Sequence, residues 1–438
     1  MVDKVNCRRA LLAETVETLR KGDRDLVSYV EDACGFIAAG EKDVQALLPE
    51  DGRGERLRRE AAALGKRFPD SRRRPVLFGA LTAVKDIFHV QGFETQAGSR
   101  LPPTQLQGPE ALVVKCLRQA GALVLGKSVT TEFAFFEPGP TRNPHHLDHT
   151  PGGSSSGSAA AVAAGYCPLA LGTQTIGSII RPAAYCGIVG FKPSFYRIPA
   201  DGLVFFSRSM DHVGFFTQDI QGAELAASVL CQAWRTVAQP GRPPRLGVPE
   251  GPYLTQADAQ GLQVFEKQLS CLEKAGCRIK SVPCLADIAA INARHRQLVF
   301  AEFAREHRAL YAAYASLYRP RTREIIEIGK TVDRKTQLQA IEAAGRLRAS
   351  LEALQRRRHI DLWLSPPAPG PAPQGLSSTG RPDMNLPWTH AGLPTITLPA
   401  GFFKNGLPAG LQIAAPFGAD EHLLAWCRRI APMLGQSC

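Results

Sequence analysis

The chain has 438 residues, of which 44% are hydrophobic, and its 52 basic and 40 acidic residues give a net charge of +12. This length is enough for one large α/β domain or for two or three average domains, and the composition is that of a globular protein with a substantial core. No run of about 18 apolar residues occurs and the first residues lack the apolar core of a secretory signal, so the sequence argues against a membrane span and predicts a cytoplasmic protein.

The first part of the chain is predicted to be helical and basic. Apolar residues between Leu11 and Ala33 recur at helical spacing, which predicts helices within 8–50. The segment 53–75, "RGERLRREAAALGKRFPDSRRRP", continues as an Arg-rich helix that ends in a basic loop. The chain lacks the aromatic, helix-turn-helix and zinc-finger signatures of nucleic-acid binding, so we expect a solvated helix face there. A bias toward anionic substrates is the alternative.

From residue 76 onward the pattern changes to short apolar runs that alternate with helices. Within 76–235 the runs "VLFGALTAVKD", "ALVLGKS", "CPLALGTQT" and "CGIVGFKPS" are predicted to be strands. Residues 255–358 are charged and helical, and 360–438 contain three more strand patterns, "IDLWLSP", "PTITLPAGFF" and "GLPAGLQIAAP", before a last helix. This order predicts a single α/β domain over 1–438 with a mixed sheet, an N-terminal helical segment at 1–75 and a helical insertion at 255–358.

Two glycine-rich stretches are candidates for a phosphate loop. "GALVLGKS" (121–128) matches the pattern G-x-x-x-x-G-K-[ST], but a helix pattern precedes Gly121 and the residues between its glycines look like a buried strand. We therefore interpret it as the end of a strand followed by a turn. "GGSSSGS" (152–158) has no GK[ST], and its alanine-rich continuation is too apolar for a flexible linker. Because buried serines need partners, this second loop is expected to carry chemistry.

Two other stretches are less informative. "PPAPGPAPQGLSSTGRP" (366–382) is interpreted as a long surface or active-site loop between two buried strands. His145, His146 and His149 lie close together, but no carboxylate or cysteine pattern accompanies them, and the cysteines have no zinc spacing. The sequence therefore predicts no metal and no cofactor.

Residues 150–194, "TPGGSSSGSAAAVAAG…LALGTQTIGSIIRPAAYCGIVGFKPS", resemble the signature of the Ser–cisSer–Lys amidohydrolases, the amidase signature family. That pattern is long and specific. "LTAVKDIF" (81–88) and the C-terminal strand patterns are similar to other family segments, so the resemblance covers about 76–235 and 360–438. It implies the amidase signature fold, in which a central mixed β-sheet is covered by α-helices on both faces.

The resemblance also implies a catalytic triad. Ser178 matches the nucleophile, Ser154 matches the serine that follows a cis peptide bond, and their separation, 178 − 154 = 24, is the family's spacing. Lys85 matches the base. A serine hydroxyl is a weak nucleophile until a base takes its proton, and a lysine can be that base only when it is neutral, which burial favours.

Further residues of the signature have implied roles around this triad. The backbone N–H groups expected to form the oxyanion hole are those of Thr175, Ile176, Gly177 and Ser178. The residues expected to bind within the site or to orient its loops are Ser155, Thr173, Gln174 and Asp211, whereas Trp388 and Thr389 are expected to line the substrate cleft.

The chain departs from the commonest family pattern near the nucleophile. Many members have an arginine two residues after it, whereas this chain has Ile180 there and Arg181 next. With Gln174 in place of aspartate, this resembles a malonamidase-like branch, in which the corresponding arginine contacts a substrate carboxylate. A structural salt bridge or cap is the alternative role for Arg181. Ile176 replaces the usual glycine, so we expect either a strained backbone, if positive φ is needed there, or a narrowed pocket.

The predicted function is hydrolysis of a small amide through an acyl-enzyme on Ser178, and an amide that bears a carboxylate is one candidate substrate. One alternative is the catalytic subunit of a glutamine-dependent amidotransferase complex. Another is a basic scaffold or nucleic-acid-binding protein whose catalysis Ile176 has impaired, and esterase or peptidase activity is a third. The expected partner is a small-molecule amide, without nucleic acid or membrane, and a homodimer is one assembly that the sequence allows.

Overall fold

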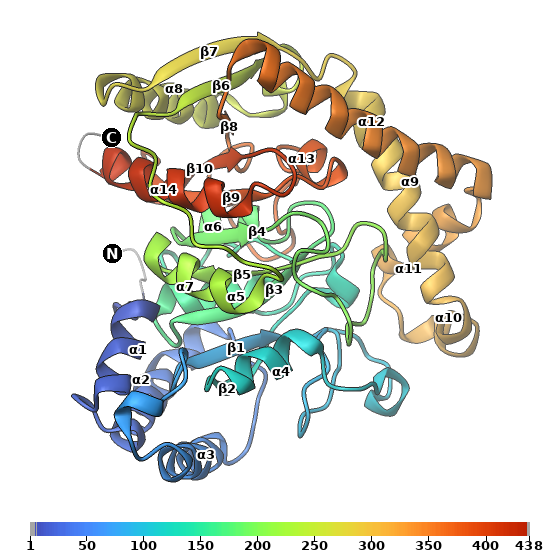
Figure 1. Cartoon of the computed structure of the whole chain (residues 1–438). Helices are drawn as coiled ribbons and strands as arrows, with labels where there is room; N and C mark the ends of the chain where they lie inside the picture. Colours follow the sequence, from blue (N-terminus) through green and yellow to red (C-terminus); the bar gives the residue numbers. More distant parts are fainter. Residues whose placement is uncertain (1–4, 6, 436–438) are drawn as a thin grey trace.

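The computed structural model describes residue 5 and residues 7–435. In this part of the chain ten strands form one mixed sheet (Figure 1). The strands are β1 (Leu81–Lys85), β2 (Leu123–Ser128), β3 (Leu169–Gln174), β4 (Val189–Lys192), β5 (His212–Thr217), β6 (Arg245–Glu250), β7 (Arg278–Pro283), β8 (Leu362–Ser365), β9 (Thr395–Phe402) and β10 (Pro408–Ala414). Their order in the sheet is β2-β1-β3-β5-β4-β9-β10-β8-β6-β7.

Parallel strands lie at the two ends of the sheet and antiparallel strands lie in its middle. The pairs β2–β1 and β1–β3 are parallel, as are β8–β6 and β6–β7, and the pairs between β3 and β8 are antiparallel. The prediction of a mixed sheet is therefore confirmed.

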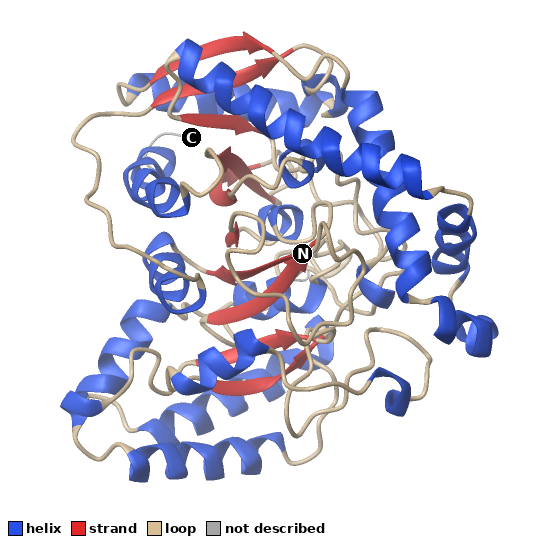
Figure 2. Cartoon of the chain, turned by 45° about the vertical axis from the view of Figure 1, so that its right-hand side comes forward, coloured by secondary structure: helices blue, strands red, loops and turns tan. Residues whose placement is uncertain are grey.

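Helices cover both faces of the sheet (Figure 2). They are α1 (Leu12–Lys21), α2 (Leu26–Val44), α3 (Arg53–Arg67), α4 (Leu112–Gln119), α5 (Ser156–Ala164), α6 (Ile180–Tyr185), α7 (Ile220–Leu230), α8 (Ala259–Lys274), α9 (Ile288–Glu306), α10 (Arg308–Tyr314), α11 (Pro320–Lys330), α12 (Arg334–Arg358), α13 (Leu386–His390) and α14 (Asp420–Gly435). None of the helices in the described residues is long and apolar enough to cross a membrane.

The alternation of side chains along the central strands creates a hydrophobic core on each face. In β3, Leu169 and Leu171 belong to one core, together with residues of α7 and α14, whereas Ala170 belongs to the other, together with α5. Because both of its faces are buried, β3 reads as a continuous apolar run, which is why the sequence identified it.

Helix α5 packs unusually close to its neighbours because its residues are small. All nine residues, "SGSAAAVAA", are buried. A Cβ added at Gly157 would lie 2.1 Å from the carbonyl oxygen of Ala46 and 2.4 Å from the backbone nitrogen of Val129. Glycine is therefore required at this position, and the serine-rich loop that begins α5 is held deep in the molecule.

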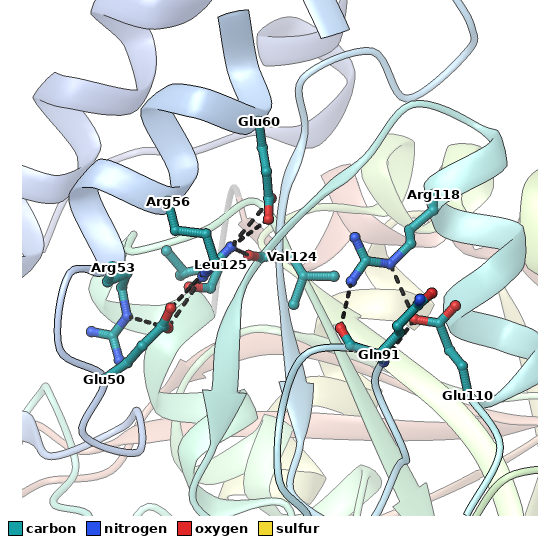
Figure 3. A network of polar contacts seen from close by, with 9 residues as sticks. All are labelled: Glu50, Arg53, Arg56, Glu60, Gln91, Glu110, Arg118, Val124 and Leu125. Atoms are coloured by element: carbon teal, nitrogen blue, oxygen red, sulfur yellow. Dashed lines mark hydrogen bonds and ion pairs between the residues drawn. The ribbon is translucent and has the colours of Figure 1, made fainter. Parts of the chain in front are cut away.

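The Arg-rich helix α3 packs against the edge strand β2 (Figure 3). Arg56 donates hydrogen bonds to the carbonyl oxygens of Val124 and Leu125, at 3.0 and 3.1 Å, and forms ion pairs with Glu50 and Glu60. These contacts occupy carbonyl groups where the register of β1 and β2 shifts. The expectation of a solvated face is therefore wrong for this part of α3, which closes one edge of the sheet.

The other differences from the predicted elements concern short strands. β5, β6 and β7 were not singled out in the sequence, and β7 lies inside the segment 255–358 that was predicted to be helical. The stretch "GALVLGKS" contains β2, which ends at Ser128 as predicted. Its Lys127 forms a buried ion pair with Asp86, at 2.7 Å. A lysine held in this way is not available to bind a phosphate.

Candidate active site

The candidate site lies at the ends of the parallel strands β1 and β3. Lys85 is the last residue of β1, and its Nζ donates hydrogen bonds to Ser154 Oγ at 2.7 Å and to Thr173 Oγ1 at 2.8 Å. Lys85 is fully buried and Ser154 is 3% exposed. The structure thus brings together three residues that lie far apart in the sequence and that sequence analysis assigned to one site.

The serine-rich loop positions Ser154 through its backbone. The peptide bond between Gly153 and Ser154 is cis, as the resemblance implied, and the Ser154 carbonyl oxygen accepts a hydrogen bond from the backbone N–H of Thr131. Ser155 Oγ accepts from the Thr173 N–H at 3.3 Å and donates to the Thr173 carbonyl oxygen at 3.2 Å. Ser155 therefore fastens this loop to the end of β3.

The loop 175–179 connects β3 to α6 and contains Ser178. Gln174 Oε1 accepts hydrogen bonds from the N–H groups of Ile179 and Ile180, at 2.8 and 3.0 Å, and its Nε2 donates to Thr389 Oγ1. This side chain satisfies N–H groups at the start of α6 that have no partner within the helix. Gln174 therefore orients the loop from inside the protein.

Asp211 holds the other end of the same loop. Its carboxylate accepts hydrogen bonds from Thr175 Oγ1, at 2.5 Å, and from the N–H groups of Phe206 and Ser207. Burial raises the pKa of Asp211 to about 6, although these hydrogen bonds oppose the shift. Its side chain is thus a support for the loop, as the sequence suggested.

A narrow pocket lies at the site. Its lining residues are Ala134, Phe135, Phe136, Ser154, Thr175, Ile176, Gly177, Ser178, Arg181, Phe206, Thr379 and Pro382. Both predicted catalytic serines therefore face the same space, and Thr379 and Pro382 identify the loop 366–382 as an active-site loop. The three phenylalanines that wall the pocket were not predicted, because nothing in their local sequence links them to the signature.

The environment of Lys85 favours a neutral amine. Desolvation by burial lowers the pKa of Lys85 to about 7, and the charge of Asp211 opposes that shift. Two hydroxyl groups contact the amine, and a hydroxyl oxygen can accept from it or donate to its lone pair when the proton is lost. Lys85 can therefore exchange a proton near neutral pH.

Arg181 is a buried cation with unused hydrogen-bond donors. It is 1% exposed, and its Nη2 donates to the Gly153 carbonyl oxygen at 2.6 Å and to Thr379 Oγ1 at 3.2 Å. Its Nε and Nη1 have no partner in the described part of the chain. Burial lowers the pKa of Arg181 to about 10. Arg181 forms no ion pair with any described residue. The structural salt bridge that was considered as its role is therefore absent from the described part of the chain.

Ile176 adopts an ordinary backbone conformation. Its φ is not positive, so the strain considered for this position does not occur. The side chain is 7% exposed, lines the pocket and packs in a hydrophobic cluster with Trp388. Trp388 itself donates to Tyr253 and does not line the pocket, and Thr389 contacts the Ile176 carbonyl oxygen from behind the loop. Narrowing of the pocket is therefore the remaining effect of Ile176, and the cleft-lining role expected of Trp388 and Thr389 is wrong.

The three neighbouring histidines contact the backbone. His145 Nε2 lies 2.9 Å from the Cys186 carbonyl oxygen, and His149 Nδ1 lies 2.8 Å from that of Ala372. Within residues 5 and 7–435 no group of three or more His, Cys, Asp or Glu side chains is arranged to hold a metal ion.

The fold and the signature residues define the class of protein. Residues 30–424 match the family model named Amidase. Because this match spans most of the chain, the protein belongs to the amidase family, and its fold is the amidase signature fold.

Particular members of the family are similar over nearly their whole length. The A subunit of the glutamyl-tRNA(Gln) amidotransferase of Thermus thermophilus is 33% identical over 452 residues, which cover 92% of this chain and 93% of that relative. A solved structure described as an amidase is 31% identical with a TM-score of 0.85, covering 96% of this chain and 99% of the other. Another, from a vestigial protein complex that reveals the origins of an s-triazine catabolic enzyme, is 27% identical with a TM-score of 0.85, covering 97% and 98%.

Proposed function

We propose that this chain cleaves the C–N bond of a small amide through an acyl-enzyme on Ser178. The observation that carries the proposal is the hydrogen bond between Lys85 and Ser154, buried at a pocket that Ser178 also lines. In this proposal Ser178 is the nucleophile, Lys85 is the base, and Ser154 passes protons between them as a Ser-Lys variant of the catalytic triad.

The proposed reaction has two steps, formation of the acyl-enzyme and its hydrolysis. Ser178 Oγ attacks the amide carbonyl carbon and loses its proton to Ser154, which gives its own proton to neutral Lys85. When the tetrahedral intermediate collapses, the C–N bond breaks and the amine leaves with a proton returned from Lys85 through Ser154. A water molecule attacks the acyl-enzyme by the same route, which releases the acid and restores Ser178.

The oxyanion of that intermediate is assigned to the backbone of the nucleophile loop. The N–H groups of Ile176, Gly177 and Ser178 donate to no other group in the described part of the chain, and these residues line the pocket. One such donor is typically worth about 10²- to 10³-fold in rate.

A carboxylate on the substrate is the finer part of the proposal. A guanidinium is a favoured partner of a carboxylate, and Arg181 lines the pocket with Nε and Nη1 unused. Because Nη2 already donates to the protein and these two groups lie on different edges of the guanidinium, each offers a carboxylate a single hydrogen bond. A bound carboxylate would accept from one of these donors and offset the cost of burying the charge. This arrangement supports the malonamidase-like assignment made from the sequence.

Substituting Arg181 tests this preference. In Arg181→Ala, kcat/KM for an amide that bears a terminal carboxylate is expected to fall about 100-fold, because a charge-assisted hydrogen bond to the buried guanidinium is lost. For the matched uncharged amide the change is expected to stay within about threefold. Arg181→Lys is the control, since it keeps a donor near the Gly153 carbonyl oxygen. Equal losses on both substrates would mean that Arg181 supports the loop and does not bind a carboxylate.

A second candidate function is the amide-cleaving component of a glutamine-dependent amidotransferase complex. The similarity to the A subunits of glutamyl-tRNA(Gln) amidotransferases favours it more directly than it favours an independent hydrolase. Glutamine is itself a small amide with a carboxylate, so the same site and the same use of Arg181 apply to it.

Assays of the purified chain separate the two functions. If the chain is an independent hydrolase, it is expected to turn over its amide at an ordinary rate of about 1 to 10³ per second without other proteins. If it is one component of an amidotransferase, it is expected to hydrolyse glutamine poorly alone and to be activated when co-expressed partner proteins are bound. Ammonia release from glutamine and from a panel of short amides, with Ser178→Ala as the blank, measures this directly.

A further inference from the structure

Two buried histidines outside the signature lie beside the nucleophile loop, where His295 of α9 contacts the loop and His390 of α13 contacts His295. His295 Nε2 lies 3.0 Å from the Thr175 carbonyl oxygen, and His295 Nδ1 lies 3.1 Å from His390 Nδ1. His295 is 0% exposed and His390 is 2% exposed, and their rings are nearly perpendicular at 81°. The proposed reaction uses neither side chain.

The hydrogen bonds define one proton arrangement for this pair. Burial and the neighbouring His390 keep the pKa of His295 well below its usual value, and burial lowers the pKa of His390 to about 4, so both rings are neutral. A carbonyl oxygen can only accept, so His295 carries its proton on Nε2 and accepts through Nδ1. His390 must then carry its proton on Nδ1. Its bare Nε2 is the ring atom that has no partner among the described residues.

Holding the Thr175 carbonyl oxygen fixes the direction of the next N–H group. In a trans peptide unit the C=O of one residue and the N–H of the next lie in one plane and point in opposite directions. The Thr175 carbonyl oxygen faces His295, which turns the Ile176 N–H away from α9. In the same way, Thr389 Oγ1 holds the Ile176 carbonyl oxygen at 2.7 Å and so orients the Gly177 N–H.

The third N–H group of the loop is oriented by α6 itself. The Gly177 carbonyl oxygen accepts from the Arg181 N–H at 3.1 Å, which fixes the peptide plane that contains the Ser178 N–H. Three consecutive carbonyl groups therefore have donors of their own, from α9, α13 and α6. Of these, the contact from α9 is the one that depends on the tautomer of a second side chain.

We propose that His295 is a positioning residue that aims the Ile176 N–H at the oxyanion, and that His390 supports it by fixing its tautomer. This inference rests on the proposed function, because it assumes that the reaction at Ser178 places negative charge beside the loop. It assigns a role in the site to a segment, 255–358, that carries little of the family signature.

Amide side chains test the inference because they reproduce one imidazole nitrogen at a time. Glutamine places an amide nitrogen near the position of Nε2, and asparagine places one near that of Nδ1. His295→Gln is therefore expected to keep the bond to Thr175, whereas His295→Asn loses it. At position 390 the order reverses, because His390→Asn keeps the donor toward His295 and His390→Gln misplaces it.

The readout is the second-order rate at which a fluorophosphonate labels the protein, since its phosphoryl oxygen occupies the oxyanion hole during the attack. We expect His295→Asn to slow labelling about 10- to 100-fold, because a misdirected Ile176 N–H removes part or all of the contribution of one oxyanion-hole donor. We expect His295→Gln and His390→Asn to stay within about threefold of the unmodified chain, and His390→Gln to fall between the two groups. With a substrate in hand, the same losses are expected in kcat rather than in KM.

Thermal unfolding of all four variants separates positioning from folding. The inference is supported if glutamine labels faster than asparagine at position 295, asparagine labels faster than glutamine at position 390, and the unfolding midpoints are unchanged. A loss of packing alone would not favour glutamine at one position and asparagine at the other. Equal losses in both variants at position 295, or no loss in either, would overturn it. If the unmodified chain labels at a residue other than Ser178, the proposed function fails instead, and mapping the adduct reveals this separately.

Discussion

Replacing Ser178 with alanine is expected to reduce turnover by at least about 10⁴-fold, because removing a serine nucleophile eliminates the covalent route and leaves only binding and the oxyanion hole. The substitution removes one hydroxyl from a residue that is 8% exposed, so the fold is expected to remain intact. The measurement is the steady-state rate on the best amide substrate, with circular dichroism as the test of folding. Ser228→Ala, which removes an exposed hydroxyl on α7, is the control and is expected to leave the rate unchanged.

Mapping the labelled serine sharpens this first prediction. Lys85 contacts Ser154 directly, and Ser154 lines the same pocket as Ser178. A mechanism in which Ser154 is the nucleophile is therefore the alternative to be tested. Mass spectrometry of fluorophosphonate-treated protein is expected to find one adduct per chain, on the peptide that contains Ser178. An adduct on Ser154, retained in Ser178→Ala, would exchange the two roles.

Replacing Lys85 with alanine is expected to lower kcat by about 10²- to 10⁴-fold, the usual contribution of a positioned base. In the unmodified chain kcat is expected to rise with pH through about 7, since burial lowers the pKa of Lys85 to about 7 and only the neutral amine accepts a proton. Lys85→Ala is expected to lose this rising limb as well. A pH profile between about 5 and 9, recorded with both proteins, measures the effect, and near-normal activity in Lys85→Ala would contradict the mechanism.

The same pKa shift has a signed effect on stability. The pKa of Lys85 is about 7 in the folded chain against an ordinary value of 10.5, so between these values the unfolded chain binds more protons. The Lys85 contribution to the free energy of unfolding therefore rises with pH across this window. Asp211→Asn is a companion variant. The variant lacks the negative charge that raises the pKa of Lys85, so the rise of kcat with pH is expected to move to lower pH.

The parts of the fold that the sequence predicted are those with a strong local signal. Most central strands read as apolar runs because they are buried on both faces, and the signature places Lys85, Ser154 and Ser178 by motif. The central strand β5 is also buried but was not singled out. β6 and β7 lie at the end of the sheet, and β7, "RIKSVP", alternates exposed charged residues with few apolar ones. A short strand such as β7, which is mostly exposed, gives too weak an apolar pattern to detect.

The parts of the site that could not be predicted come from distant segments. Phe135, Phe206 and His295 reach the pocket or its loop only because α9 and two connecting loops pack over the ends of the strands. Their local sequences resemble those of ordinary core residues. The role of Arg56 was missed for a similar reason, because a shift in the register of an edge strand leaves no mark on the sequence of the helix that covers it.

The pairing of β4 with β9 also has a consequence for when the candidate site is completed during synthesis. It joins Gly190 to Thr397, and the donors Thr389 and His390 lie in the same late segment. A ribosome therefore makes Ser178 and the nearer supports of its loop, Gln174, Asp211 and His295, before it makes Thr389, which holds the Ile176 carbonyl oxygen. Because strand pairs distant in sequence form slowly, the loop gains this last donor only after the C-terminal strands have begun to form. Under the proposed function, the oxyanion site is therefore completed late in synthesis.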